Sequence, residues 1–257
     1  MFHLMAFAGA KTDSTANQNV PAVSDACLTL SANNRYICPD DVRVFAAQAM
    51  NDTITRARIT APSLRNIGLP EIYPVSVYAT PTGDPKYAWW DKYGPMLRRN
   101  EEVGVECSNG ASTSDFARAA LWVSNRFEPV PNGSRLTIVG TSTQTLVQDA
   151  WTLGGITLDQ VLPVGRYSVI GLHVTCTAAA FARLVFPRGG TWRPGVGTTP
   201  TVGGFNQANH FRSGELGDWG QFDSIAQPQI ELLGTTAGSQ TATVILDLVQ
   251  VSQSVMG

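Results

Sequence analysis

Charged residues are scarce in this chain. Of its 257 residues 15% are Asp, Glu, Lys or Arg, against roughly 25% in a typical soluble domain, so little charge is available to solvate a monomer's surface. Three of the 18 basic residues are lysine and 15 are arginine, and the formal net charge of −2 argues against a general nucleic-acid binder. Interfaces prefer arginine to lysine, although a biased genomic base composition would give the same ratio. The composition therefore favours a surface that is covered by copies of the same chain.

Cysteine and histidine are few and dispersed. The four cysteines are Cys27, Cys38, Cys107 and Cys176, and the three histidines are His3, His173 and His210. They form no CxxC, HxH or HExxH pattern, so we expect no metal site and no cofactor. We expect buried free thiols, although the spacing leaves a bridge between Cys27 and Cys38 open.

Familiar catalytic patterns are also missing. No G-x-S-x-G occurs, and Gly195-Val196-Gly197 lacks the third glycine of a dinucleotide site. Glu215, Asp218 and Asp223 could supply the paired carboxylates of a glycosidase, but turn formation and solvation in a Gly-rich loop explain them better. We therefore expect a protein that is not an enzyme.

Signals for a membrane or for secretion are not found either. No apolar run approaches the roughly 20 residues that a membrane helix needs. The first 11 residues lack the basic segment of a signal peptide, so we expect a chain made in a cytoplasm and without a membrane span.

The chain does contain many short segments in which apolar and polar residues alternate. In the clearest, Ile170, Leu172 and Val174 point to one face and His173 to the other, and a second run follows at 180–186. The predicted core residues are Leu172, Val174, Leu246 and Leu248. Similar segments, with turn signals between them, recur at 55–59, 72–78, 103–107, 117–123, 145–151, 229–233 and 241–251. The pattern predicts an all-β fold, a β-sandwich of the jelly-roll type. Residues 39–50 fit either a helix or a strand.

The predicted organisation is an arm followed by one domain. Residues 1–25 are small and polar over most of their length and predict a flexible or extended arm. Residues 26–257 predict a single sandwich with long Pro/Gly-rich loops at 60–100 and 187–226. No internal repeat of fixed period is visible.

The segment 189–223 has 35 residues, nine of them glycine, and five large aromatic side chains. Ordering so much glycine is costly, and loops of this length are usually functional. We expect burial of its aromatic residues against a neighbouring subunit to offset that cost, with help from the N-terminal arm. The predicted interface residues are Trp192, Arg193, Phe205, Phe211, Arg212, Trp219 and Phe222.

The whole pattern resembles the jelly-roll capsid and virion proteins of icosahedral viruses, including bacteriophages. A small polar arm leads into short strands with long Pro/Gly-rich loops, and the segment TATVILDLVQV closes the sheet. The resemblance covers residues 26–252. It implies a structural subunit of a virus-like shell, located in the virion, that assembles with copies of itself and other shell proteins through loops and arm.

The alternative is a carbohydrate-binding β-sandwich module, lectin-like or receptor-binding on a virion, with a glycan as its partner. Such modules stack exposed aromatic rings on sugars, and the candidates are Trp89, Trp90, Trp192 and Trp219. They are usually secreted and tethered to a second domain. This sequence shows neither a signal nor a linker, so we prefer the shell subunit.

Overall fold

A computed structural model describes residues 2–11, 16–50, 54–65, 73–75, 77–78, 87–109, 115–188, 190–199 and 209–253. Contacts between Cα atoms divide the chain into two compact units, whereas the sequence leads us to expect one domain after an arm. The C-terminal unit comprises Met1–His3 and Arg126–Gly257, and the N-terminal unit comprises Leu4–Asn125. The division at residue 125 falls between strands, because one strand ends at Ser124 and the next begins at Ser134.

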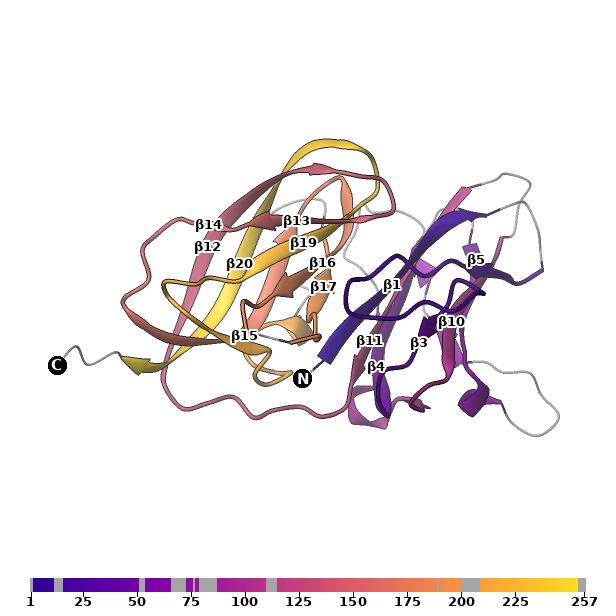
Figure 1. Cartoon of the computed structure of the whole chain (residues 1–257), viewed down its shortest axis with the longest axis horizontal. Coiled ribbons are helices and arrows are strands. Elements are labelled where there is room, and N and C mark those ends of the chain that lie inside the picture. The colour runs from indigo at the N-terminus through magenta and orange to yellow at the C-terminus, as the bar shows by residue number, and fades with distance from the viewer. Residues whose placement is uncertain are drawn as a thin grey trace. The chain divides into compact units, whose positions relative to one another are not determined.

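The C-terminal unit consists of two antiparallel sheets (Figure 1). The first has the order β14-β12-β20-β15-β18, formed by Thr157–Leu158, Ser134–Leu146, Gly238–Gln253, Gly165–Thr175 and Gly220–Asp223. The second has the order β13-β19-β16-β17, formed by Trp151–Gly155, Gln229–Gly234, Ala179–Val185 and Gly195–Gly197. When the two-residue strand β14 is left out, the other eight strands of the unit can be numbered 1 to 8 in chain order. The first sheet then has the order 1-8-3-6 and the second has the order 2-7-4-5. This is the winding of two Greek keys in a jelly roll.

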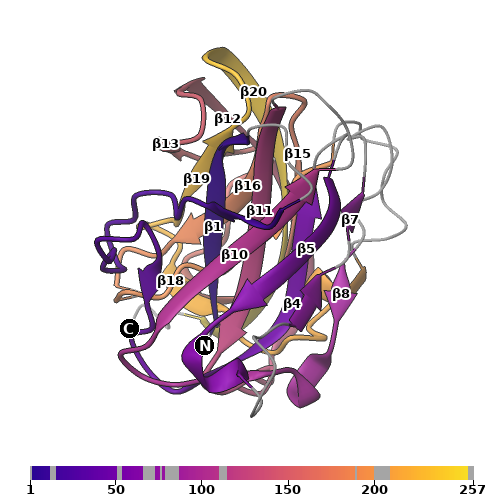
Figure 2. The same cartoon turned by 90° about the vertical axis from the view of Figure 1, so that its right-hand side faces the viewer.

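The N-terminal unit repeats this winding (Figure 2). Its first sheet has β1, β11 and β4 in order, formed by Phe2–Lys11, Asp115–Ser124 and Val42–Met50; β4 also pairs with β7 (Val77–Tyr78), β8 (Ala88–Trp89) and β9 (Met96–Leu97). Its second sheet has the order β2-β10-β5-β6, formed by Gln18–Val20, Glu102–Asn109, Ile54–Thr60 and Tyr73–Val75; β3 (Tyr36–Ile37) pairs with β10. We number the strands of this unit from 1 to 8 in chain order, counting β8 and β9 together as the sixth and leaving out β3 and β7. The first sheet then has the order 1-8-3-6 and the second has the order 2-7-4-5, as in the C-terminal unit. The chain is therefore a tandem of two jelly rolls.

The cores follow from the alternation in the strands. In β12, every second residue from Ile138 to Leu146 is buried and the residues between them are exposed, so one face of this strand points inward. Leu172 of β15 lies opposite Leu246 of β20, and both are buried. These side chains occupy the faces that the sequence assigns to the core.

Strand β15 is buried on both faces, which the sequence does not predict. His173 is 2% exposed and its Nε2 lies 3.3 Å from the hydroxyls of Thr175 and Thr199. The backbone N–H of Thr199 donates to the carbonyl of Val174, so a residue from beyond β17 helps to cover this second face.

We expect Leu172→Ala to lower the free energy of unfolding by about 2–5 kcal/mol, because it leaves a cavity in the core. His173→Ala should also be costly, by about 1–3 kcal/mol, since it removes a buried polar partner of two hydroxyls. Urea denaturation of the two variants tests this, and a neutral His173→Ala would show that the second face is open.

Two local expectations are decided by the structure. Residues 42–50 form β4 and not a helix, since this segment is buried on both faces between neighbouring strands. The sequence predicts a flexible or extended arm at 1–25. Residues 2–11 and 18–20 are extended, but they are part of the sheets, where they form β1 and β2. The hydroxyl of Tyr36 fixes this region by donating to the carbonyls of Ala6 and Val23 at 2.9 and 2.6 Å.

The two predicted loops contain regular structure. Residues 60–100 include β6 to β9 and the 3₁₀ turns η1 (Pro62–Leu64) and η2 (Asp91–Tyr93). Residues 187–226 include β17, the turn η3 (Asn209–Phe211) and β18. Short edge strands of this kind lack a clear alternation, because two to four residues do not establish a period. Within the described residues, no helix is long and apolar enough to cross a bilayer.

All four cysteines are free, as predicted, and the open alternative of a bridge between Cys27 and Cys38 is wrong. Burial raises the pKa of Cys38 to about 12 and also raises the pKa of Cys176. Because a nucleophilic cysteine must be a thiolate, these two thiols behave as small apolar side chains near neutral pH.

Candidate functional site

The segment 209–219, from the loop that the sequence singles out, lies along strand β15. The N–H of Gly214 donates to the carbonyl of Ile170 at 2.9 Å, and the N–H of Trp219 donates to the carbonyl of Val169 at 2.8 Å. A Cβ atom on Gly171 would lie 2.9 Å from the Cα atom of Arg212, so only glycine permits this approach. The segment is thus ordered by its own unit.

A partly buried ion pair holds the same segment to β20. Arg212 donates to both carboxylate oxygens of Asp247, at 2.5 and 2.8 Å, and the N–H of Ser213 and the hydroxyl of Thr137 donate to them at 3.0 and 2.8 Å. Burial alone would raise the pKa of Asp247, but these hydrogen bonds and the Arg212 charge outweigh it and lower the pKa. The carboxylate is therefore ionised at neutral pH and stabilises the docked segment.

Three aromatic residues of the predicted interface are buried in the C-terminal unit. Phe211, Trp219 and Phe222 are 0, 2 and 4% exposed. Trp219 packs edge-on against Phe2 at 4.7 Å and Phe211 at 6.4 Å, while Phe222 stacks on Tyr167 at 5.7 Å. Burial within the unit therefore offsets the cost of ordering this segment. These three side chains have almost no surface left for a neighbouring subunit, which corrects the expectation drawn from the sequence.

The other predicted interface residues differ in exposure and partners. Trp192 and Arg193 are half-buried; the N–H of Arg193 donates to Nδ1 of His3 at 3.0 Å, and its guanidinium donates to the carbonyl of Gly190 at 2.8 Å. The Arg212 guanidinium is paired with Asp247, as described above. Phe205 lies outside the described residues. Subunit contacts of Trp192 and Arg193 stay a prediction.

A cavity of about 600 Å³ lies beside these residues in the C-terminal unit. Its aromatic lining is Phe186, Trp192, Trp219 and Phe222, and its polar side chains come from Glu128, Arg166, Arg188, Thr191, Asp218, Gln221 and Asp223. β18 supplies one wall, and residues 186–188 and 190–192 supply another. Both tryptophans are conspicuous in the sequence, but Arg166, Arg188 and Gln221 are not, because only tertiary structure brings these segments together.

The three carboxylates considered for a glycosidase each have a local partner. Glu215 lies 2.6 Å from Nδ1 of His210, and Asp223 lies 3.6 Å from Arg188. Asp218 accepts from the N–H of Gly220 and from the Gln221 amide, both at 2.8 Å, which is the turn chemistry expected of this loop. Among the described residues, no group of three or more His, Cys, Asp or Glu side chains could hold a metal ion.

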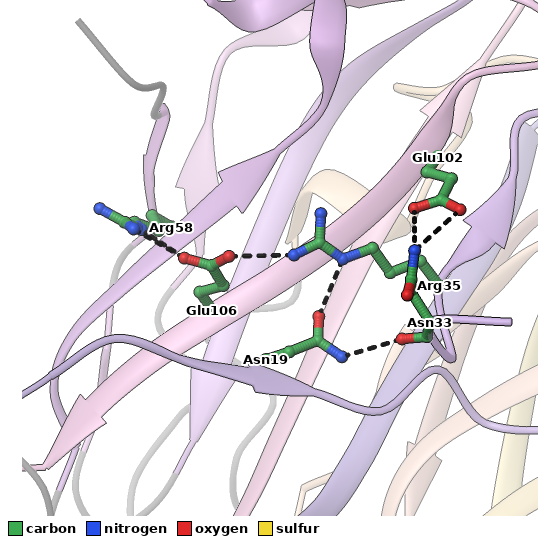
Figure 3. A network of polar contacts seen from close by, with 6 residues as sticks. All are labelled: Asn19, Asn33, Arg35, Arg58, Glu102 and Glu106. Atoms are coloured by element: carbon green, nitrogen blue, oxygen red, sulfur yellow. Dashed lines mark hydrogen bonds and ion pairs between the residues drawn. The ribbon is translucent and has the colours of Figure 1, made fainter. Parts of the chain in front are cut away.

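The N-terminal unit carries a half-buried polar network over β10 (Figure 3). The Glu106 carboxylate accepts from Arg35 at 3.0 Å and from Arg58 at 2.7 Å. Arg35 also donates to the Asn19 side chain at 3.2 Å, and the Asn33 amide donates to Glu102 at 3.1 Å. Because the network joins β2, the turn at 31–35 and β5 to one strand, its role in the unit is to hold those segments in place.

The remaining candidate sugar-stacking tryptophans pack on the N-terminal unit. Trp89 contacts Phe45 edge-on at 5.7 Å, and the neighbouring Tyr87 contacts Trp122 at 5.3 Å. Trp89 and Trp90 are both half-buried. These contacts show that aromatic residues fix this loop to β4 and β11.

Comparison with known proteins finds similarity to solved structures. No protein-family model matches the chain, and no curated protein matches it significantly. Among solved structures, the chain is similar to the major capsid protein P2 from bacteriophage PM2, with 9% sequence identity, a TM-score of 0.23 and coverage of 99% of each chain.

Proposed function

We propose that this chain is a structural subunit of a virus-like protein shell and is located in the virion. The observation that carries the proposal is the tandem of two jelly rolls with the same strand orders, within a chain that has 15% charged residues. Jelly rolls are a recurrent architecture of viral capsids. A fold alone does not decide a function, so the surface of the units matters as well.

Large apolar side chains are exposed on the C-terminal unit. Val161, Val164 and Ile225 are 94, 56 and 89% exposed. They lie in two turns that are joined by hydrogen bonds between Gly165 and Ser224, at 2.9 and 3.2 Å. Covering each such side chain with a second copy of the chain would contribute on the order of 1.5–3 kcal/mol. These turns therefore support the proposal that copies of the chain associate.

The test is the mass of the purified full-length protein, measured by sedimentation at micromolar concentration. We expect assemblies many times heavier than the 27.5 kDa chain. The Val161→Ser/Ile225→Ser variant should assemble at least tenfold more weakly, while Val139→Ser, on the outer face of β12, serves as the matched control. A wild-type protein that stays monomeric at tens of micromolar contradicts the proposal.

A further inference from the structure

We propose that the 600 Å³ cavity of the C-terminal unit binds an uncharged carbohydrate, such as the hexose end of a cell-surface glycan. This is a binding function in addition to the shell role, and it concerns one site with named walls. The volume lies within the range of about 300–1,000 Å³ that is typical of small-molecule sites.

The apolar part of the cavity suits the C–H face of a sugar ring. Trp192 is half-buried, so part of its indole remains accessible at the cavity. Phe186 is 5% exposed and lies under β18, where a Cβ atom on Gly220 would come within 2.8 Å of its ring. The accessible part of the Trp192 indole offers a rigid contact area and a polar N–H.

The segment 218–223 supplies acceptors and donors to the cavity. Gln221 and Asp223 are two residues apart on β18, so their side chains point to the same face. Asp218 accepts one hydrogen bond at each carboxylate oxygen, and an ionised carboxylate can accept about four in all. Carboxylates and amides arranged in this way can accept hydrogen bonds from neighbouring sugar hydroxyls.

The charges of the cavity favour a neutral ligand. Arg166 and Arg188 face Asp218 and Asp223, which gives two positive and two negative side chains, and a third carboxylate, that of Glu128, is paired with Arg126. Arg188 is itself within 3.6 Å of Asp223. A phosphate or an acidic sugar would meet carboxylates that repel it, whereas an uncharged polyol would meet donors and acceptors in similar number.

The experiment uses the full-length protein and the methyl α-glycosides of glucose, galactose and mannose, with saturation-transfer NMR as the readout. We expect binding of at least one glycoside with a millimolar Kd. Trp192→Ala should weaken it at least tenfold, and Trp192→Phe should restore part of the affinity. Trp90→Ala, a matched change at a half-buried tryptophan of the N-terminal unit, should leave the Kd unchanged.

Three results would overturn the proposal. They are no saturation transfer to any of the three glycosides, equal binding by wild type and a folded Trp192→Ala variant, and tighter binding of inorganic phosphate than of any glycoside in isothermal titration calorimetry. Circular dichroism and the melting temperature establish that each variant is folded. Because sedimentation reports assembly and NMR reports sugar binding, failure of this proposal and failure of the shell proposal give different results.

Discussion

Replacing Asp247 with alanine should lower the free energy of unfolding of the C-terminal unit by about 3–5 kcal/mol. The substitution removes the carboxylate that pairs with Arg212 and accepts from Ser213 and Thr137. Asp247 is 6% exposed, so its partners lose a bond that water does not fully replace. Because Arg212 and Ser213 belong to the docked segment, we also expect residues 209–217 to lose protection from hydrogen exchange before the rest of the unit.

The measurement is urea denaturation combined with hydrogen exchange at neutral pH. Asp159→Ala is the matched control, since Asp159 is an exposed aspartate of the same unit. Equal effects of the two substitutions would show that the contact with Arg212 does not stabilise the fold.

The ion pair of Arg212 and Asp247 predicts that the free energy of unfolding depends on pH. The pKa of Asp247 is lower in the folded chain than its ordinary value of 3.8, so the unfolded chain binds the proton more readily. The contribution of Asp247 is complete above that ordinary value and is lost as the pH falls through the lowered folded pKa. We expect Asp247→Asn to remove this part of the acid destabilisation, whereas Asp159→Asn should not.

Replacing Glu231 with alanine should also destabilise the C-terminal unit by about 3–5 kcal/mol. Arg183 is 1% exposed and lies directly opposite Glu231 on the neighbouring strand, with 2.5 Å between Nε and Oε2. Its guanidinium carbon also lies 4.1 Å from the centre of the Trp151 ring. Without Glu231 the buried guanidinium loses its carboxylate, and the stacking on Trp151 compensates only part of that loss.

The control replaces both charges at once. The double variant Arg183→Met/Glu231→Leu should recover most of the stability in urea denaturation, because apolar side chains of similar size remove the charge that must be buried. A Glu231→Ala cost below about 0.5 kcal/mol, the size of a surface pair, would contradict the predicted role of this pair.

Alternation along the chain was sufficient for the fold class and for much of the core. Leu172 and Leu246 are correctly predicted as core residues, and the strands near 167–175 and 180–186 are found where the sequence indicates them. Alternation is a property of adjacent residues, and each strand shows it whichever strand it pairs with. The preference of cysteine for buried positions is similarly local, and it predicted the free thiols.

The candidate cavity could be anticipated only in part. The sequence indicates Trp192, Asp218 and Asp223 as candidates, because aromatic and acidic residues are conspicuous in a Gly-rich loop. Arg166 and Gln221 carry no such signal, since β15 and β18 become neighbours only through pairing between distant parts of the chain. Their place in one cavity follows from that pairing.

Tertiary structure alone decided how many jelly rolls there are and what covers each sheet. The two units share strand orders without a repeat in sequence, because many sequences satisfy the same pattern of inward apolar residues. The aromatic residues of 209–223 are buried by Phe2, Tyr167 and one another rather than by a second subunit. Apolar composition shows that a side chain is to be buried, but which surface buries it depends on contacts between residues far apart in the chain.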